Sequence, residues 1–254
     1  MILAIDAGNS RIKWGIFAQH DAPPTEPEFS GAILNEGFVD APTVWHGCTR
    51  ALLCNVAGDE MGQRISAAVN ALGIPLVHFK ASLQTCGLKN LYDQPEKLGV
   101  DRWAALVAAW QLYQQPCVVV SAGTAITIDA VNSDEQGGGV FLGGMILPGI
   151  RLMQQSLLDA TAGVKESMGE WQDFPTNTAN AVHTAAITAA AGNVKGMAAR
   201  LQQRSRVVPL VIISGGDAQL LADCLLETIV MTNKVHIVDN LVLIGLLHME
   251  RDAQ

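Results

Sequence analysis

The feature of this sequence that most restricts its fold is a turn that occurs twice, 115 residues apart. Residues 6–10 read DAGNS after the apolar run MILAI, and residues 121–125 read SAGTA after CVVV. In both places a small acceptor, Ala and Gly separate two apolar runs, which predicts strand, turn, strand. Each copy lies early in its half of the 254-residue chain. The repeat therefore indicates two halves of similar size that begin in the same way.

The first half alternates strands with helices. Its expected elements are strands over 1–5 and 12–17, a proline-rich loop over 20–30, a helix over 60–72, and a strand over 74–79. A further helix is expected to begin near Asp101 and to stop at Pro116. Trp103 and Trp110 lie on its apolar face, so we interpret both as core residues rather than as a base-stacking platform.

The second half repeats this alternation. Its expected elements are strands over 125–131 and 140–147 joined by the polar hairpin NSDEQGGG, helices over 151–162 and 178–202, and a strand over 207–213. The last strand enters a helix through Gly215 and Gly216. We therefore expect an α/β protein with a boundary at 114–116, giving domains 1–115 and 116–254.

Composition restricts the partners and the compartment. The net charge is −8 and no Lys/Arg cluster is present, which argues against nucleic acid and against an anionic membrane surface. Five scattered cysteines without a C-x-x-C motif suggest reduced thiols, and the six histidines lack metal-ligand spacing. We see neither a signal peptide nor a membrane-spanning run, so the expected location is the cytoplasm.

The repeated turn has a chemical interpretation. Gly8 and Gly123 leave backbone N–H groups free to donate to phosphate oxygens, and the carboxylate of Asp6 can hold a hydrated divalent cation. The Gly-Gly turn at 214–217 supplies a third candidate loop. A strand-glycine-strand turn is also ordinary hairpin chemistry. Neither the P-loop nor the Rossmann fingerprint occurs, so any ATP site must be built in another way.

Six ordered motifs carry a resemblance to a known family. They are DAGNSRIK (6–13), GVDRW (99–103), SAGTAITID (121–129), GGMILPG (143–149), NTANAV (177–182) and SGGDA (214–218). In this order they resemble the type III pantothenate kinases of the acetate and sugar kinase, Hsp70 and actin superfamily, and the likeness extends to DNLVLIGL at 239–246. The resemblance implies two ribonuclease H-like domains related by duplication, with an ATP cleft between them. It also implies a homodimer that phosphorylates pantothenate to 4'-phosphopantothenate, the first step of coenzyme A biosynthesis.

The resemblance further implies roles for individual residues. Those expected at the ATP phosphates are Asp6, Ala7, Gly8, Asn9, Ser10, Arg11, Ile12, Lys13 and Thr124, with Asp6 near Mg²⁺. Those expected at pantothenate are Tyr92, Gly99, Val100, Asp101, Arg102 and Thr178, with Asp101 as the general base. Many members have an aspartate, associated with a bound K⁺ or NH₄⁺ ion, where this chain has Ser121. The monovalent cation site is therefore in question here.

The chemistry asks for the same residue types. A carboxylate must accept the proton of the attacking hydroxyl, which suits Asp101, and the adjacent Arg102 suits a bidentate grip on the pantothenate carboxylate. Structural interpretations stay open. Asp101 can simply favour a helix N-terminus, Tyr92 can be an ordinary half-buried loop residue, and the glycines at 143–149 can serve packing alone.

Two other functions share these features. A phosphatase of the same superfamily, such as an exopolyphosphatase, would activate water, but the motifs contain no glutamate placed to orient it. A regulatory protein could keep the fold without turnover, although Asp6, Asp101, Arg102 and Thr124 are all present.

Overall fold

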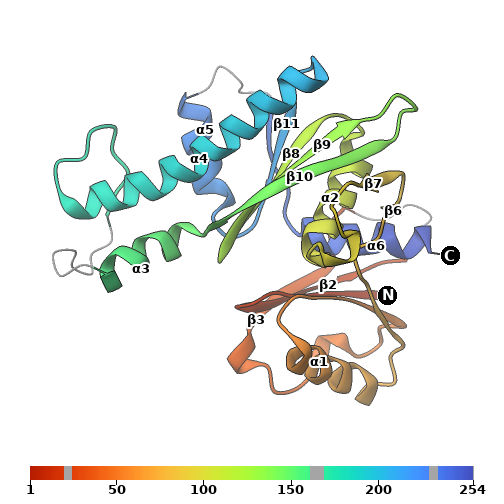
Figure 1. Ribbon diagram of the computed structural model, residues 1–254. Coiled ribbons are helices and arrows are strands. Elements are labelled where there is room, and N and C mark those ends of the chain that lie inside the picture. The colour runs from red at the N-terminus through yellow and green to blue at the C-terminus, as the bar shows by residue number, and fades with distance from the viewer. Residues whose placement is uncertain (20–24, 161–168, 229–233, 254) are drawn as a thin grey trace. The chain divides into compact units, whose positions relative to one another are not determined.

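The computed structural model describes residues 1–19, 25–160, 169–228 and 234–253. These residues divide into two compact units. Unit 1 consists of Met1–Gln114, Asp134–Phe141 and Asn240–Gln254, and unit 2 consists of Gln115–Ser133 and Leu142–Asp239. The chain first passes from unit 1 to unit 2 after Gln114, and its last helix belongs to unit 1 (Figure 1).

Unit 1 is built on a mixed sheet with the strand order β3-β2-β1-β4-β5. The strands are β1 (Ile2–Ala7), β2 (Arg11–Phe17), β3 (Phe29–Leu34), β4 (Arg50–Asn55) and β5 (Leu76–His78). The central strand β1 pairs antiparallel with β2 and parallel with β4. The 3-10 turns η1 (Asn35–Gly37) and η2 (Thr43–Trp45) connect β3 to β4. Strand β3 begins inside the segment predicted as a loop over 20–30, of which residues 20–24 lie outside the described part.

Helices cover both faces of this sheet (Figure 1). On one face, α1 (Asp59–Ala71) packs Ile65 and Val69 against Leu3, Ile5 and the tryptophans 14 and 45. On the other face lie α2 (Val100–Tyr113) and α6 (Leu241–Asp252), which pack on each other. A Cβ at Gly245 would lie 1.9 Å from the carbonyl oxygen of Ala104, so only glycine allows this approach.

A smaller group of strands completes unit 1. Strand β7 (Leu88–Asn90) pairs antiparallel with β6 (Gln84–Thr85) and parallel with the first residues of β10 (Gly139–Pro148). The 3-10 turn η3 (Pro95–Lys97) then leads into α2. Strand β7 ends two residues before Tyr92, so this group sets the start of the loop that carries the tyrosine.

Unit 2 repeats the architecture of unit 1. Its strands are β8 (Cys117–Ala122), β9 (Ala125–Ser133), β10, β11 (Leu210–Ser214) and β12 (Val235–Ile237), in the order β10-β9-β8-β11-β12. Strand β8 pairs antiparallel with β9 and parallel with β11, as β1 does with β2 and β4. The same order, with the same central strand, confirms the duplicated α/β fold predicted from the repeated turn.

Helices α3 (Ile150–Ala160), α4 (Thr178–Ser205) and α5 (Ala218–Thr228) belong to unit 2. Alanines and Ile187 of α4 pack against β8 and β9, and Leu221 and Leu225 of α5 extend the same core. The predicted helices over 151–162 and 178–202 are thus confirmed, except for residues 161 and 162, which lie outside the described part.

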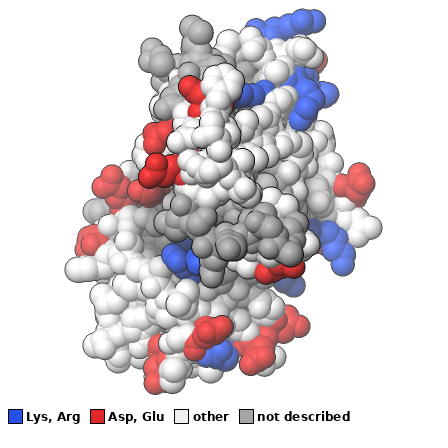
Figure 2. All heavy atoms as spheres, turned by 90° about the vertical axis from the view of Figure 1, so that its left-hand side faces the viewer, with Lys and Arg blue, Asp and Glu red and all other residues white. Residues whose placement is uncertain are grey.

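The burial of individual side chains tests several expectations from the sequence. Trp103 is fully buried and Trp110 nearly so, which confirms their core role. In the described part, every cysteine is a free thiol. No helix of the described residues is both long and apolar enough to cross a membrane. Figure 2 shows one face, on which uncharged side chains cover most of the area and charged groups occur in small separate groups.

Candidate active site

The repeated turns are hairpins of the same kind in both units. After β1, the N–H of Gly8 donates to the carbonyl of Arg11 at 3.0 Å, and after β8 the N–H of Gly123 donates to the carbonyl of Ala125 at 3.1 Å. In the first turn, Asn9 and Ser10 are exposed, whereas the side chains of Ala7 and Ile12 are fully buried in the core. Of the predicted phosphate-binding residues, Ala7 and Ile12 can therefore offer only their main chain.

Asp6 occupies the centre of a polar row across three strands. Lys13 on β2 and Cys54 on β4 are its in-register neighbours, so the three side chains lie on the same face of the sheet. The thiol of Cys54 donates a hydrogen bond to the Asp6 carboxylate. The other oxygen, Oδ1, is shielded from solvent and has no hydrogen-bond partner among the described residues.

The environment of Asp6 resists its negative charge. The pKa of Asp6 is raised from 3.8 to about 7, chiefly by burial and next by the negative charge of Asp101, while Lys13 and the hydrogen bond from Cys54 oppose the shift. Burial, together with the charges of Asp6 and Asp101, also raises the pKa of Cys54, which keeps the thiol protonated and able to donate. Two carboxylates thus share one site with a lysine, an arrangement that attracts a divalent cation.

Asp101 reaches this site from the first turn of α2. Its Oδ1 accepts a hydrogen bond of 2.8 Å from the backbone N–H of Arg102. A Cβ at Gly99 would lie 2.6 Å from that oxygen, so glycine at the N-cap makes room for the carboxylate. The helix-terminal interpretation of Asp101 is therefore correct in geometry, and it coexists with the proximity to Asp6.

Arg102 and Tyr92 lie together beside Asp101. The guanidinium of Arg102 is 5.9 Å from the centroid of the Tyr92 ring, and the Arg102 residue is only 7% exposed. The Tyr92 ring stacks on Phe141 with centroids 6.3 Å apart and an interplanar angle of 20°. Tyr92 itself is 37% exposed, so one part of the stack is open to solvent.

Three glycine turns meet in unit 2. Gly149 donates to the carbonyl of Thr124 at 2.9 Å, and a Cβ there would lie 2.2 Å from the carbonyl oxygen of Gly123. Gly215, with φ +110°, approaches the backbone of Ala122 in the same way. Gly149 is thus a packing residue, and through this close packing it also shapes the loop that carries Thr124.

Ser121 takes the place in unit 2 that Asp6 takes in unit 1. Its in-register neighbours are Thr127 on β9 and Ser214 on β11, so a row of hydroxyl groups replaces the charged row. Asp129, two residues beyond Thr127 on the same face of β9, is 2% exposed and packs against Gly144. Ser121, Thr127 and Ser214 carry no formal charge.

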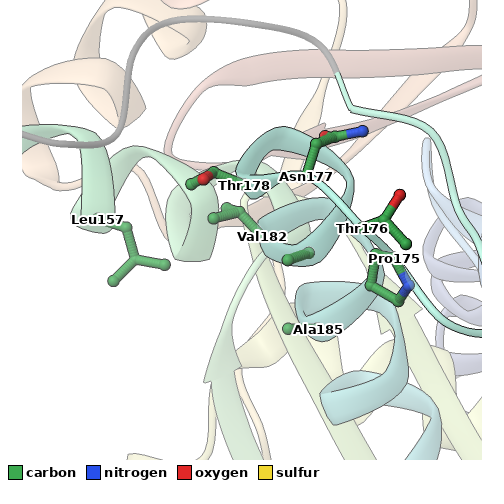
Figure 3. Close-up of a pocket in the computed structure, with 8 residues that line it drawn as sticks. Leu157, Pro175, Thr176, Asn177, Thr178, Val182 and Ala185 are labelled. Atoms are coloured by element: carbon green, nitrogen blue, oxygen red, sulfur yellow. The ribbon is translucent and has the colours of Figure 1, made fainter.

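Thr178 lies in a different part of unit 2. It is the first residue of α4 and is exposed beside Asn177, whose side chain caps the helix by accepting from the N–H of Asn180. An open groove of ≈ 560 Å³ runs here between α3 and the start of α4 (Figure 3). Its lining is Leu157, Pro175, Thr176, Asn177, Thr178, Ala181, Val182 and Ala185. Of the predicted site residues, this groove contains Thr178 alone.

The structure adds supporting residues that the sequence analysis did not identify. Asn35 donates from Nδ2 to the carbonyls of Gly8 and Asn9, both at 2.9 Å, and so holds the first turn. Cys54 supports Asp6, and Asn90 supports Tyr92. In the sequence, CN after the apolar run ALL marks Cys54 as the end of a strand, but no sequence signal marks Asn90 or connects Asn35 to residues 8 and 9.

Comparisons with known proteins agree with this architecture. Residues 2–200 match the family described as type III pantothenate kinase. A type III pantothenate kinase of Methylobacillus flagellatus is 42% identical over 252 residues, covering 98% of either chain. A Campylobacter jejuni structure named as a conserved Baf family transcriptional activator has a TM-score of 0.64 at 19% identity, covering 99% of this chain and 98% of that one. A Sinorhizobium meliloti structure named as a 2-dehydro-3-deoxygalactonokinase has a TM-score of 0.54 at 16% identity, with coverage of 99% and 98%.

The duplicated sheets and these likenesses define the fold class, a duplicated α/β fold that the chain shares with the structure named as a 2-dehydro-3-deoxygalactonokinase. Within that class, the chain belongs to the type III pantothenate kinase family. It is an enzyme, a kinase that phosphorylates pantothenate in coenzyme A biosynthesis. Family membership also decides between this activity and the phosphatase and regulatory alternatives.

Proposed function

We propose that this kinase transfers the γ-phosphoryl group of ATP to the primary hydroxyl of pantothenate, with Asp101 as general base, to give 4'-phosphopantothenate. The observation that supports this role is the position of Asp101, whose charge acts on Asp6 beside Lys13. A carboxylate at that place can accept the hydroxyl proton as the hydroxyl attacks phosphorus. The test is a coupled assay of ADP release with and without pantothenate, ATP and Mg²⁺. Absence of pantothenate-dependent ADP release would contradict the proposal.

The residues around Asp6 fit a Mg²⁺ ion that accompanies ATP. Oδ1 of Asp6 is an acceptor without a partner among the described residues, and the repulsion from Asp101 leaves a negative site that a divalent cation would neutralise. Asp6 would hold the ion, directly or through its water. When bound, Mg²⁺ would neutralise charge on the phosphate oxygens.

The first turn and the second turn are both suited to phosphate. Each hairpin presents short polar side chains near its tip, Asn9 and Ser10 in the first and Thr124 in the second, and Lys13 adds a positive charge beside Asp6. The N–H groups of Gly8 and Gly123 close the hairpins themselves, so they are not the donors expected from the sequence. We assign the ATP phosphates to residues 6–13 and to Thr124. Asn35 keeps the first turn in position through the carbonyls of Gly8 and Asn9.

Arg102 is the proposed partner of the pantothenate carboxylate. Its guanidinium is largely removed from water, so a charge-assisted bidentate bond there is stronger than on the surface. Residues 99–101, Tyr92 and Thr178 are assigned to the same substrate. Replacement Arg102→Lys keeps the charge but loses the planar fork, so the KM for pantothenate should rise while the KM for ATP stays unchanged. An effect confined to ATP would argue against this assignment.

The residues at Ser121 do not fit a tightly held K⁺ or NH₄⁺ ion. Ser121, Thr127 and Ser214 offer hydroxyl oxygens but no anionic ligand in that row. A neutral hydroxyl supplies only a weak dipole to a cation. No step of the proposed reaction is assigned to a monovalent cation.

We further infer a cytoplasmic homodimer. Leu152 and Leu157 of α3 are 46% and 42% exposed, and Phe174 is 89% exposed, so unit 2 presents apolar side chains that a second copy would cover. Free thiols agree with a reducing compartment. Light scattering coupled to size exclusion should give twice the chain mass of 27.0 kDa, and a monomer at assay concentration would contradict the dimer.

A further inference from the structure

The ring of Tyr92 has two buried neighbours, the guanidinium of Arg102 and the ring of Phe141. The guanidinium of Arg102 lies over the Tyr92 ring, 5.9 Å from its centroid. The ring of Phe141 stacks on that of Tyr92, with centroids 6.3 Å apart and an interplanar angle of 20°. Phe141 is fully buried, whereas Tyr92 is 37% exposed. The fixed part of this stack is therefore Phe141, and the part that can move is Tyr92.

The backbone at Tyr92 is held by a second buried group. The N–H of Tyr92 donates to Oδ1 of Asn90 at 3.0 Å, and Nδ2 of Asn90 donates to the carbonyl of Ser82 at 3.1 Å. Asn90 is 1% exposed. It is also the in-register partner of Phe141 where β7 meets β10, and the N–H of Leu91 donates to the carbonyl of Phe141 at 3.2 Å. Phe141 and Asn90 thus fix the ring and the backbone of the same tyrosine.

We propose that Phe141 is a positioning residue for substrate recognition, acting through Tyr92 on the guanidinium of Arg102. This inference rests on the proposed role of Arg102 as the partner of the pantothenate carboxylate. A flat ring beneath Tyr92 restricts its tilt, and the Tyr92 ring in turn favours one position of the guanidinium by cation–π attraction. Without the ring of Phe141, Tyr92 and Arg102 lose that alignment, and the substrate must restore it on binding.

A residue that only fills the core would behave differently from this. Loss of a core ring lowers stability without selecting between two substrates. Loss of a positioning ring weakens pantothenate binding and leaves the ATP site, which uses residues 6–13 and Thr124, unaffected. The two roles are separated by comparing the KM values of the two substrates and by testing whether the effect of Phe141 requires the ring of Tyr92.

The experiment uses Phe141→Leu, Tyr92→Leu and the double variant, with Phe38→Leu as the matched control. Phe38 is a buried phenylalanine of unit 1 that packs on Trp45 with centroids 6.2 Å apart. Steady-state kinetics gives kcat and both KM values, and calorimetry gives the Kd for pantothenate. We expect Phe141→Leu to raise the KM and Kd for pantothenate roughly tenfold, with kcat and the KM for ATP changed less than about twofold. Phe38→Leu should lower the melting temperature without this pattern.

The double variant decides the mechanism. If Phe141 acts through Tyr92, Phe141→Leu adds little once the Tyr92 ring is absent, so the two effects are not additive. Fully additive effects, or equal changes in both KM values, would overturn the proposal. Because Tyr92 is partly exposed, Tyr92→Leu and Tyr92→Phe should fold even if Phe141→Leu does not. Tyr92→Phe keeps the ring and should retain the affinity, and a loss equal to that of Tyr92→Leu would also overturn it.

Arg102→Ala separates this inference from the proposed function. If Arg102→Ala leaves the pantothenate Kd unchanged, the assignment of Arg102 fails and the inference fails with it. If Arg102→Ala weakens pantothenate but Phe141→Leu does not, only the positioning role of Phe141 is wrong.

Discussion

The thiol of Cys54 donates a hydrogen bond to the carboxylate of Asp6, its in-register neighbour on the adjacent parallel strand. Cys54 is fully buried, so this bond is shielded from water. The pair gives Asp6 one satisfied oxygen and leaves Oδ1 available. The uncharged thiol thereby favours the ionised form of a carboxylate whose ionisation burial and Asp101 oppose.

We expect Cys54→Ala to weaken the binding of Mg·ADP, whereas Cys54→Ser, which keeps a donor, should bind nearly as the parent does. The reason is that the alanine variant leaves Asp6 without its donor and less able to ionise. Titration calorimetry with Mg·ADP should show a loss of roughly three- to tenfold for Cys54→Ala, the size of one typical hydrogen bond, because a thiol is a weak donor. An equal loss in both variants would indicate a packing effect instead.

The ligand-free enzyme should lose stability as the pH rises from about 4 to about 7. Because the pKa of Asp6 is raised from 3.8 to about 7, the folded state binds more protons than the unfolded state across this window. Above pH 7 both states are ionised and this contribution is constant. Thermal melts in EDTA across this range measure the effect.

Asp6→Asn is the corresponding variant. It removes the cost of ionising Asp6 in the folded state and should stabilise the ligand-free protein at pH 8 by about 2 kcal/mol. The full pKa shift corresponds to ~4 kcal/mol, and the smaller figure is expected because Asp6 is only half-buried. The same variant should lose nearly all activity. If it melts with the same pH dependence as the parent, Asp6 is not the group responsible.

Asp101→Asn should lower kcat by roughly 100-fold or more and leave the fold intact, because the amide cannot accept the hydroxyl proton. Its Oδ1 can still accept from the N–H of Arg102, so the start of α2 keeps its contact. Circular dichroism and the melting temperature serve as the control. Turnover close to that of the parent would refute the assignment of Asp101 as general base.

Turnover should depend less steeply on K⁺ or NH₄⁺ than in relatives with an aspartate at this position, and Ser121→Asp should strengthen the dependence. The hydroxyl row offers no anionic ligand, and the substitution supplies one. Rates are measured against KCl and NH₄Cl at constant ionic strength, with NaCl or a bulky cation as the replacement. A parent enzyme that is silent without K⁺ and saturates tightly would contradict this, and Asp129 would then be the residue to substitute next.

Much of the fold could be predicted because its turns, strands and helices are encoded by short stretches of neighbouring residues. The turns at Gly8 and Gly123, the helix begun near Asp101 and the strands of the hairpins all follow from apolar periodicity and glycine placement. The edge strand β3 and the helix α6 were not identified. Strand β3 begins at Phe29 inside a proline-rich segment, and α6 is apolar on most sides because α2 covers it, which weakens its helical period.

The site was predictable only where motif and chemistry coincided. Asp6, Asp101 and Arg102 carry formal charge in unusual places, so the sequence indicates them. Cys54 and Phe141 look like ordinary strand residues. Their importance arises from strand register, because Cys54 lies opposite Asp6 and Phe141 lies opposite Asn90. Pairing between strands that are distant in the chain cannot be predicted from any single segment of the sequence.

The two equivalent rows, Lys13–Asp6–Cys54 and Thr127–Ser121–Ser214, have a consequence for how such a protein can diverge. Both copies of the sheet have the same strand order, and the rows differ in three side chains at matching positions, two of which, Lys13 and Asp6, carry the charge. A change of chemistry at either copy therefore requires no new topology. Exchanging these three residues between the copies would be the smallest graft able to move a charged centre from one half of the molecule to the other.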